Sequence, residues 1–296
     1  MSIIEIGQGD LKAKVSSVGS SLISLASENF HLIEPNTPTQ LYPGSVLAPW
    51  PNRIRDGRYQ YNNLQYQLPL NEPQRGNALH GLVAYEQWEV IYNSETEVQF
   101  HYLLDKPDIY PGKLSLNSYF KIENNQLRVQ ITAKNIGINS APYGVSIHTY
   151  LLAGGKIKNN ELTLKIPADK YMAVDETRLL PIGLRDVVNT KFDFQNGKVI
   201  SDIFIDHAFK YSSEHSRQVE LLNQQGDGAV IEFDEATNWI QVHTADRDGG
   251  ENSRVTVAIE PMSCPADAFN SKEDLIELSA QTEHSFMIKI WRKKTL

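Results

Sequence analysis

The sequence predicts a nearly all-β protein in the form of one large antiparallel β-sandwich. Apolar and polar residues alternate with the period of a β-strand from end to end of the 296 residues. Several alternating runs are paired through turn residues, and no strand-helix-strand rhythm indicates a parallel sheet. Since antiparallel sheets must bury one face, we expect sheets packed face to face within a single domain, residues 1–296.

Three hairpins follow one another along the chain. They cover residues 58–68 (RYQYNNLQYQL), 116–135 (LNSYFKIENNQLRVQITAKN) and 219–233 (VELLNQQGDGAVIEF). Asparagine and glycine tolerate the positive φ angles that tight hairpin turns require. The turns are therefore expected at Asn62 and Asn63, at Asn124 and Asn125, and at Gly226 and Gly228.

Two further strands each carry one titratable side chain on the face opposite their apolar residues. The strand at 144–152 (GVSIHTYLL) presents His148, and the strand at 254–260 (RVTVAIE) presents Glu260. Helical signals are sparse along the chain. A single short helix is expected at 271–281 (SKEDLIELSAQ).

The composition excludes several classes of partner. A formal net charge of -8 opposes the phosphate contacts that drive nucleic-acid binding, and the one short basic run is RKK at 292–294. The longest apolar runs are strand-sized, and the first residues lack the pattern of a signal peptide. We therefore expect a cytoplasmic protein that binds neither nucleic acid nor membrane. Cys264 is the only cysteine, which fits a reducing compartment and precludes an intrachain disulfide.

Common catalytic motifs are also missing. The sequence has no G-x-S-x-G elbow, no G-x-x-x-x-G-K-[ST] loop and no H-E-x-x-H pair. Its eight histidines are scattered, with none at metal-ligand spacing on one element. A site of three histidines from distant strands stays open at this point.

Glu260 and His148 lie on strand faces that also carry small residues. Gly144 and Ser146 accompany His148, and Ala258 accompanies Glu260. An isolated Glu or His on a strand more often faces water, but exposed strand positions usually carry long polar side chains. The small residues instead suggest the lining of a concavity. One acid and one base in such a place suit proton transfer.

Three other segments concentrate unusual residues. APWPNRIRDGRY (48–59) holds Asn52 and Arg53 between prolines and a glycine turn, and RGNALHGL (75–82) holds His80 beside glycine. DIFIDHAFK (202–210) places Asp206 and His207 after an apolar run. Taken singly, such residues are more often a surface turn, a loop or a strand cap.

In this order, these segments resemble the aldose 1-epimerase (galactose mutarotase) family. The matching motifs are N-R-I in PNRIRDGRY, N-A-L-H-G around His80, IYPGKLSL at 109–116, H-x-Y in IHTY, D-x-x-F in DHAF, and IEP at Glu260. The resemblance runs from about residue 10 to the closing strand HSFMIKIWR. It implies a supersandwich of the galactose mutarotase type whose concave face binds a monosaccharide and interconverts its α and β anomers.

The resemblance also implies roles for individual residues. Glu260 matches the general base and His148 the general acid. The positions that hold the sugar hydroxyls are matched by Arg53, His80 and Asp206, and Asn52 and Tyr150 fall within the same motifs. Base and acid both return to their starting states after ring opening and reclosure, so the reaction needs no cofactor and no metal.

The identity of the substrate stays open. Thr149 and Leu151 depart from the better-known galactose mutarotases, and IEPMSCPADAFN looks closer to a less characterised bacterial branch, so a preference for galactose does not follow. A second branch acts on hexose 6-phosphates and would need basic residues at the pocket mouth. Suitable loops carry four arginines, at Arg53, Arg55, Arg58 and Arg75.

Two other classes of function stay open at this point. The scaffold could hold a carbohydrate without turning it over, or a glycosidase could pair Glu260 with Asp206. We expect most aromatic residues to belong to the core. His243 and the loop at 245–254 precede the strand of Glu260 and could border the pocket, but we expect them to form an exposed turn. The chain is expected to be a monomer or a homodimer.

Overall fold

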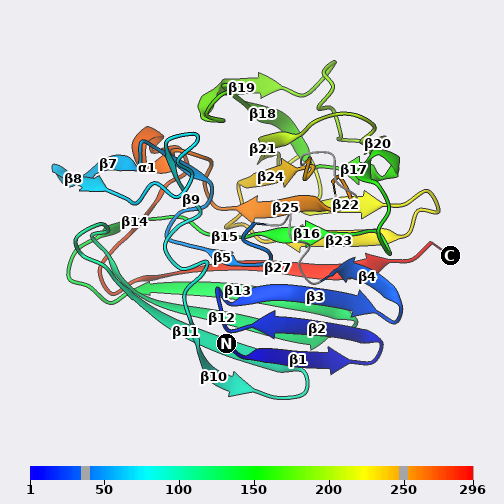
Figure 1. Ribbon diagram of the computed structural model, residues 1–296, viewed down its shortest axis with the longest axis horizontal. Helices are drawn as coiled ribbons and strands as arrows, with labels where there is room; N and C mark the ends of the chain where they lie inside the picture. The colour runs from blue at the N-terminus through cyan, green and yellow to red at the C-terminus, as the bar shows by residue number, and fades with distance from the viewer. Residues whose placement is uncertain (35–40, 247–252, 296) are drawn as a thin grey trace.

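The largest sheet among the described residues has nine antiparallel strands (Figure 1). A computed structural model describes residues 1–34, 41–246 and 253–295 of the chain. The strands of the nine-stranded sheet are, in spatial order, β10 (Glu89–Asn93), β11 (Glu97–Asp105), β12 (Lys113–Glu123), β13 (Gln126–Asn135), β27 (Glu283–Lys293), β23 (Gly228–Phe233), β22 (Gln218–Leu222), β17 (Thr163–Lys165) and β20 (Lys198–Val199).

A second, eight-stranded sheet carries the polar residues that concern function. Its strands are, in spatial order, β19 (Pro181–Asp186), β18 (Ala168–Val174), β21 (Asp206–Tyr211), β24 (Trp239–His243), β25 (Val257–Met262), β15 (Ser146–Ile147) and β5 (Val46–Leu47), with β16 (Thr149–Leu151) also paired to β25.

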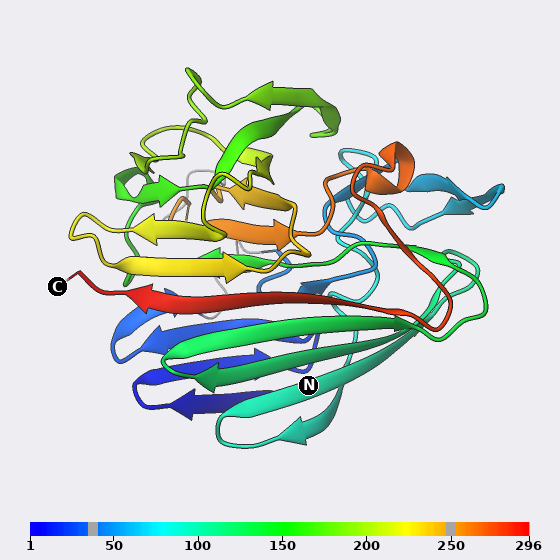
Figure 2. The same cartoon turned by 180° about the vertical axis from the view of Figure 1, so that it is seen from behind.

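Smaller elements complete the fold. A four-stranded sheet lies across the strands β11 to β13, in front of them in Figure 1 and behind them in Figure 2. It contains β1 (Ile3–Gln8), β2 (Leu11–Ser16), β3 (Ser21–Ser27) and β4 (Phe30–Ile33). Three two-stranded ribbons pair β6 (Arg53–Arg55) with β9 (Asn77–Leu79), β7 (Arg58–Tyr61) with β8 (Leu64–Gln67), and β14 (Ala141–Tyr143) with β26 (Ile276–Leu278). The helical elements are η1 (Asn159–Glu161) and α1 (Ala268–Ser271).

Alternation along the strands explains why the sheets stack. Every second residue of β12 is buried while the residues between them are partly exposed. Buried side chains from the nine-, eight- and four-stranded sheets then join in one continuous apolar cluster. The predicted all-β sandwich architecture is therefore confirmed. Among the described residues, no helix is long and apolar enough to cross a membrane.

The three predicted hairpins are also confirmed. β7 joins β8 and β12 joins β13 through Asn-Asn pairs, and all four asparagines have positive φ angles between 47° and 63°. β22 joins β23 through a turn in which Gly226 has a φ of 83°. Gly228 is not a turn residue, because it already belongs to β23 and pairs with Leu222.

The helix predicted at 271–281 is wrong. The one α-helix of the described chain, α1, ends where the segment begins, and Lys272 then takes a left-handed φ of 66°. The rest of the segment contains β26, in which Ile276 and Leu278 are more buried than Glu277 between them. This alternation has the period of a strand, and pairing with β14 satisfies its backbone.

The strand predicted at 144–152 is divided at His148. The backbone N–H of His148 donates to the carbonyl of Ser45 (3.0 Å), and its carbonyl accepts from the N–H of Gly44 (2.8 Å). The chain there bonds to the segment before β5, and it resumes pairing with β25 at Thr149. The strand carrying Glu260 begins three residues later than predicted, at Val257.

Candidate active site

Neighbouring strands of the eight-stranded sheet place three polar side chains in one row. The pairings of β15 and β16 with β25 share one register, which puts His148 opposite Glu260. From the other side, β24 pairs Gln241 with Glu260. Because directly opposed residues of antiparallel strands face the same side of a sheet, His148, Glu260 and Gln241 point in one direction.

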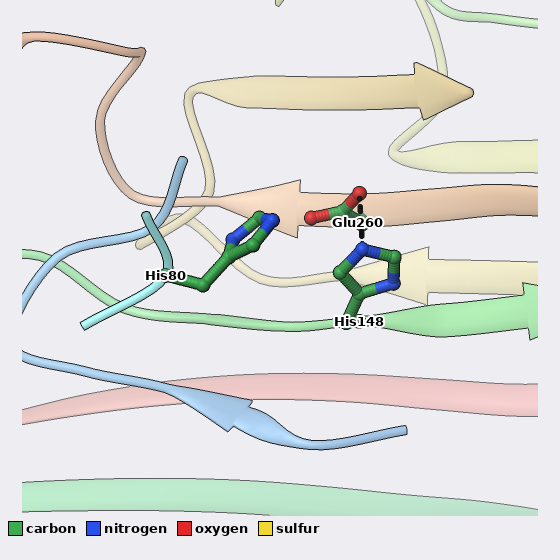
Figure 3. Close-up of side chains that lie close together, drawn as sticks. All are labelled: His80, His148 and Glu260. Carbon is green, nitrogen blue, oxygen red and sulfur yellow. Dashed lines mark ion pairs between the residues drawn. The ribbon is translucent and has the colours of Figure 1, made fainter. Parts of the chain in front are cut away.

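His148 and Glu260 are in contact. Nε2 of His148 lies 3.4 Å from Oε1 of Glu260, and the two residues are only 5% and 2% exposed. Figure 3 shows the imidazole ring and the carboxylate facing each other, with the ring of His80 on the other side of the carboxylate. An acid and a base are therefore held within reach of one small ligand.

A second row lies one step further along the same strands. Asp206 pairs with His243, which pairs with Ala258, which in turn pairs with Tyr150. The side-chain amide of Gln241 donates to Oδ1 of Asp206 (2.7 Å), so the two rows are linked. Alternation on four strands thus brings these polar groups onto one face.

Asn52 and His80 close the ribbon formed by β6 and β9. Both have left-handed backbones, with φ angles of 57° and 60°. The N–H of His80 donates to the carbonyl of Asn52 (2.9 Å), and the N–H of Asn52 donates to Nδ1 of His80 (3.2 Å). A backbone N–H can only donate, so Nδ1 is unprotonated and the neutral ring carries its proton on Nε2. Burial, together with the charges of His148 and Arg53, lowers the pKa of His80 well below its usual value.

Arg53 is fixed by a buried carboxylate that the sequence analysis did not identify. Nε and Nη2 of Arg53 donate to the two oxygens of Glu72, at 2.9 and 3.0 Å. Glu72 is 4% exposed and also accepts from Nη1 of Arg75 (3.0 Å) and from the amide of Asn77 (2.9 Å). On its other side, Nη2 of Arg53 lies 3.9 Å from Oδ2 of Asp206. Arg53 therefore bridges the loop of Glu72 and the sheet.

All seven residues that the sequence analysis selected line one cavity of about 570 Å³. They come from loops near the start of the chain and from strands much later in it. The complete lining consists of Leu41, Tyr42, Asn52, Arg53, Asn71, Glu72, Gln74, Arg75, Leu79, His80, Tyr85, His148, Tyr150, Phe204, Asp206, Gln241, His243, Asp246 and Glu260. The structure brings the predicted residues together, and their individual roles stay predictions.

Some aromatic residues line this cavity as well, namely Tyr42, Tyr85, Tyr150 and Phe204. The ring of Tyr42 lies 4.7 Å from that of His80 and 6.3 Å from that of His148. Tyr85 packs on Tyr42 at 4.8 Å. Burial, Tyr85 and Glu72 raise the pKa of Tyr42 to about 12, so its hydroxyl is uncharged at neutral pH. The sequence around Tyr42 contains no signal for this role.

The small residues do not line the cavity, contrary to expectation. A side chain at Gly144 would collide with Cys264, whose Sγ would lie 2.5 Å from the added Cβ. Ser146 donates to the carbonyl of Pro261 (2.7 Å), and Ala258 is fully covered in a cluster with Tyr150. Alternation located the correct face of each strand, but it does not reveal which positions are covered by other segments.

The expectation of an exposed turn around His243 is also corrected. The side chain of His243 is 19% exposed and its Nδ1 lies 3.9 Å from Oδ2 of Asp206. Asp246, in the loop that follows, lines the cavity too. The middle of that loop, residues 247–252, lies outside the described residues.

The pKa values of the two carboxyl groups Asp206 and Glu260 are shifted in opposite directions. Burial raises the pKa of Asp206, but His243 and Arg53 lower it, and the result is a pKa below the usual value. Glu260 behaves in the opposite way. Burial, with Asp206 nearby, raises the pKa of Glu260 well above its usual value although Arg53 opposes the change. Asp206 therefore stays ionised more readily than Glu260, as two carboxyls with different roles should.

Two of the four loop arginines face the cavity, and both are already paired. Arg53 and Arg75 share Glu72. Arg55 instead contacts Asp267 and is half exposed, and Arg58 donates to Gln67 on the hairpin of β7 and β8. Neither of these two lines the cavity. No cluster of free cations is therefore formed by these four residues at the mouth.

His80, His148 and Glu260 have spacing that a metal ion could use, since one donor atom of each lies within 4.8 Å of the others. The hydrogen bond from Asn52 argues against such use. It occupies the lone pair of Nδ1 of His80, and the proton on Nε2 occupies the other nitrogen. A histidine that binds a metal through one nitrogen usually donates through the other, which is the reverse of the arrangement here.

Comparison with known proteins agrees with this picture. The family model described as aldose 1-epimerase matches residues 2–291. The chain is 33% identical over 295 residues to the uncharacterized protein YihR of Escherichia coli strain K12, covering 98% of this chain and 93% of that protein. It is 27% identical over 195 residues to the aldose 1-epimerase of the same strain, covering 64% of this chain and 55% of that protein.

A solved structure shares the fold. The GalM/aldose epimerase homologue from C. elegans aligns with a TM-score of 0.88 and 19% identity, covering 100% of this chain and 99% of that one. At this level of identity the likeness concerns the fold, which is of the predicted galactose mutarotase type.

Proposed function

Because the chain belongs to the aldose 1-epimerase family, we propose that it interconverts the α and β anomers of an unphosphorylated hexose by acid-base opening and reclosure of the ring. The observation that carries the proposal is the contact of His148 with Glu260 across adjacent strands, inside a polar cavity. Binding a sugar would not require an acid and a base matched in this way.

The reaction moves one proton at each of two oxygen atoms of the sugar, O1 and the ring oxygen. The carboxylate of Glu260 removes the proton from the hydroxyl on C1, and the C1–O1 bond becomes a carbonyl as the bond from C1 to the ring oxygen breaks. The imidazolium of His148 gives its proton to that ring oxygen. After rotation about C1–C2, the hydroxyl returns its proton to His148 and attacks the other carbonyl face, while Glu260 returns its proton to O1.

The surrounding groups are suited to hold the sugar during this rotation. Arg53 and Nε2–H of His80 can donate to hydroxyl oxygens, and Asp206 can accept from hydroxyl hydrogens. Each is held by other residues: Arg53 by Glu72, His80 by Asn52 and Asp206 by Gln241. Such support reduces the reorganisation needed when substrate binds.

The charge distribution favours a free sugar over a hexose 6-phosphate. A phosphate group would need unpaired donors such as arginine forks. Both arginines of the cavity already bind Glu72, and Asp206, Asp246 and Glu260 add acidic groups to the lining. A phosphate group would therefore find neither arginine of this cavity unpaired.

The two other classes of function receive less support. A glycosidase needs a second carboxyl that can act opposite Glu260. Asp206 is engaged by Gln241 and Arg53 and its pKa is lowered, which suits a binding role. A non-catalytic sugar-binding protein would leave the buried pair of Glu260 and His148 without purpose. Cytoplasmic location and a monomeric or dimeric state remain predictions.

The test is polarimetry of freshly dissolved α-glucose and α-galactose, beside a coupled assay of glucose 6-phosphate. We expect faster equilibration of a free hexose, and at least about tenfold lower kcat/KM for the phosphorylated sugar, equivalent to about 1.4 kcal/mol. Faster turnover of the phosphorylated sugar would assign the chain to the other branch. Binding of sugar without any rate enhancement would favour the non-catalytic class.

A further inference from the structure

Arg178 lies outside the cavity but is bonded to the loop that carries Glu72. It belongs to the turn between β18 and β19. Its Nε donates to the carbonyl of Arg75 (2.8 Å), and its Nη2 donates to the carbonyl of Gly76 (2.8 Å) and to Oδ1 of Asn77 (3.2 Å). Nη2 also contacts Oδ1 of Asp56 (2.8 Å), in the turn that follows β6. One guanidinium thus joins three separate segments.

Asn77 connects Arg178 to the cavity. Its amide donates to Oε2 of Glu72 (2.9 Å) and to the carbonyl of Arg178 (3.0 Å), and Asn77 is fully buried. Glu72 in turn holds Arg53 through both of its oxygens. An unbroken series of hydrogen bonds therefore runs from Arg178 through Asn77 and Glu72 to Arg53.

The turn that presents Arg178 is itself built by one side chain. The carboxylate of Asp175 accepts from the N–H groups of Thr177 (3.2 Å), Arg178 (2.7 Å) and Leu180 (3.0 Å). The bond from the N–H of Arg178 contributes most to lowering the pKa of Asp175 to about 2, and the bonds from Thr177 and Leu180 add to it. At neutral pH the carboxylate is ionised and accepts all three bonds, which hold the backbone of the turn that presents Arg178.

We propose that Arg178 is a positioning residue, which fixes the loop of residues 72–77 and through it the guanidinium of Arg53 in the sugar site. The inference rests on the proposed function, because it concerns the same cavity. Arg53 has a long side chain with several rotamers, and a misplacement of about 1 Å caused far from the chemistry can cost up to ~10²-fold in kcat/KM. Lysine cannot replace Arg178, since one ammonium group does not match acceptors arranged around a planar fork.

The test compares Arg178→Met and Arg178→Lys with the matched control Arg185→Met, which removes an exposed arginine from β19 of the same hairpin. For each variant, kcat and KM are measured by polarimetry and the Kd of the sugar by calorimetry. We expect KM and Kd to rise roughly tenfold or more in both Arg178 variants, with kcat nearly unchanged, because Arg53 contributes binding rather than proton transfer. Arg185→Met should resemble the wild type.

A double variant shows whether the effect travels through Asn77. If it does, the double variant Arg178→Met/Asn77→Ser should raise Kd over the wild type by much less than the product of the two single effects. Full additivity, or Arg178 variants that bind sugar as the wild type does, would overturn the inference. Should Arg178→Met not fold, Arg178→Lys carries the same comparison.

The binding measurement separates this inference from the proposed function. If the wild type binds a sugar without accelerating its mutarotation, the proposed function fails, while Kd still reports on Arg178. If the wild type equilibrates the anomers and the Arg178 variants do so with unchanged KM, the inference alone fails. A wild type that binds no sugar would overturn both.

Discussion

Glu260 is buried where the proposed reaction needs a base, and this position costs stability. Its pKa is raised by burial, so the folded protein binds its proton more tightly than the unfolded chain does. The favourable contribution of such a group is present below the unfolded pKa, about 4.3, and is lost as pH rises through the folded pKa. At higher pH the carboxylate is a charge that folding must desolvate.

Glu260→Gln should therefore be more stable than the wild type at neutral and alkaline pH. We expect Tm at pH 8 to rise by roughly 2 °C or more, and the difference to shrink as pH falls toward 4. Thermal unfolding followed by circular dichroism at several pH values measures this. The control is Glu283→Gln, which changes an exposed carboxyl on β27. A Tm gain that is the same at every pH would contradict the explanation.

His80 should be neutral, with its proton on Nε2, throughout the physiological pH range. The N–H of Asn52 fixes Nδ1 as an acceptor, and burial lowers the pKa of the ring. Nitrogen-15 NMR of the histidine side chains should show an unprotonated Nδ1 at pH 6 that does not titrate on the way to pH 8. A proton on Nδ1, or titration near pH ~6.5, the value of an unperturbed histidine, would refute the assignment.

Individual site residues could be predicted where their neighbours on the same strand indicated the face on which they lie. Glu260 and His148 each share a face with small residues, and that face does point to the cavity. Glu72 escaped prediction because its importance depends on Arg53, 19 residues earlier, and on contacts of two loops. Likewise, Gln241 lies beside Glu260 only because β24 pairs with β25 in this register, which the sequence of β24 alone does not reveal.

Among the elements, those governed by local turn chemistry were predictable. Asn-Asn pairs have a mechanism for left-handed turns, and both predicted hairpins with such pairs are present. The segment 271–281 was misassigned, since its charged residues resemble a helix while β26 is stabilised by pairing with β14, far away in sequence. The division of a strand at His148 depends in the same way on bonds to Gly44 and Ser45.

The loop that follows β9 depends on a glycine with no room for a side chain. Gly81 has a φ of 74°, and a Cβ there would lie 2.1 Å from the carbonyl oxygen of Ala48. Gly81→Ala should lose about 1–3 kcal/mol of unfolding free energy from backbone strain alone, and displacement of His80 should lower kcat/KM. Urea denaturation and polarimetry measure the two effects.

Gly155→Ala is the matched control for that substitution. A Cβ at Gly155 would meet nothing within 4 Å, and its backbone is not left-handed. We expect its midpoint of denaturation to stay close to that of the wild type. If the two alanine variants unfold at the same urea concentration, the close approach of Gly81 to Ala48 does not constrain the fold.

The cavity is assembled from segments that lie far apart in the chain. Segments from residues 41–85 meet residues 148–150, 204–246 and Glu260 at one face of the eight-stranded sheet. Alternation predicted an all-β sandwich, but it contains no information on which loop covers which strand. The site residues from distant segments were predicted only because their motifs resemble those of a known family. Tyr42 and Glu72 lie outside these motifs and were therefore missed.

Under the proposed function, this assembled cavity is a proton-transfer site that acts on a free sugar. NMR exchange spectroscopy at equilibrium tests this most directly, because it reports the rate of conversion between the α and β anomers of glucose and galactose. We predict that the wild type accelerates the exchange of at least one sugar. Glu260→Gln should lower that rate by roughly 10²- to 10⁴-fold while its Kd stays similar. Equal exchange rates with the two proteins would contradict the claim.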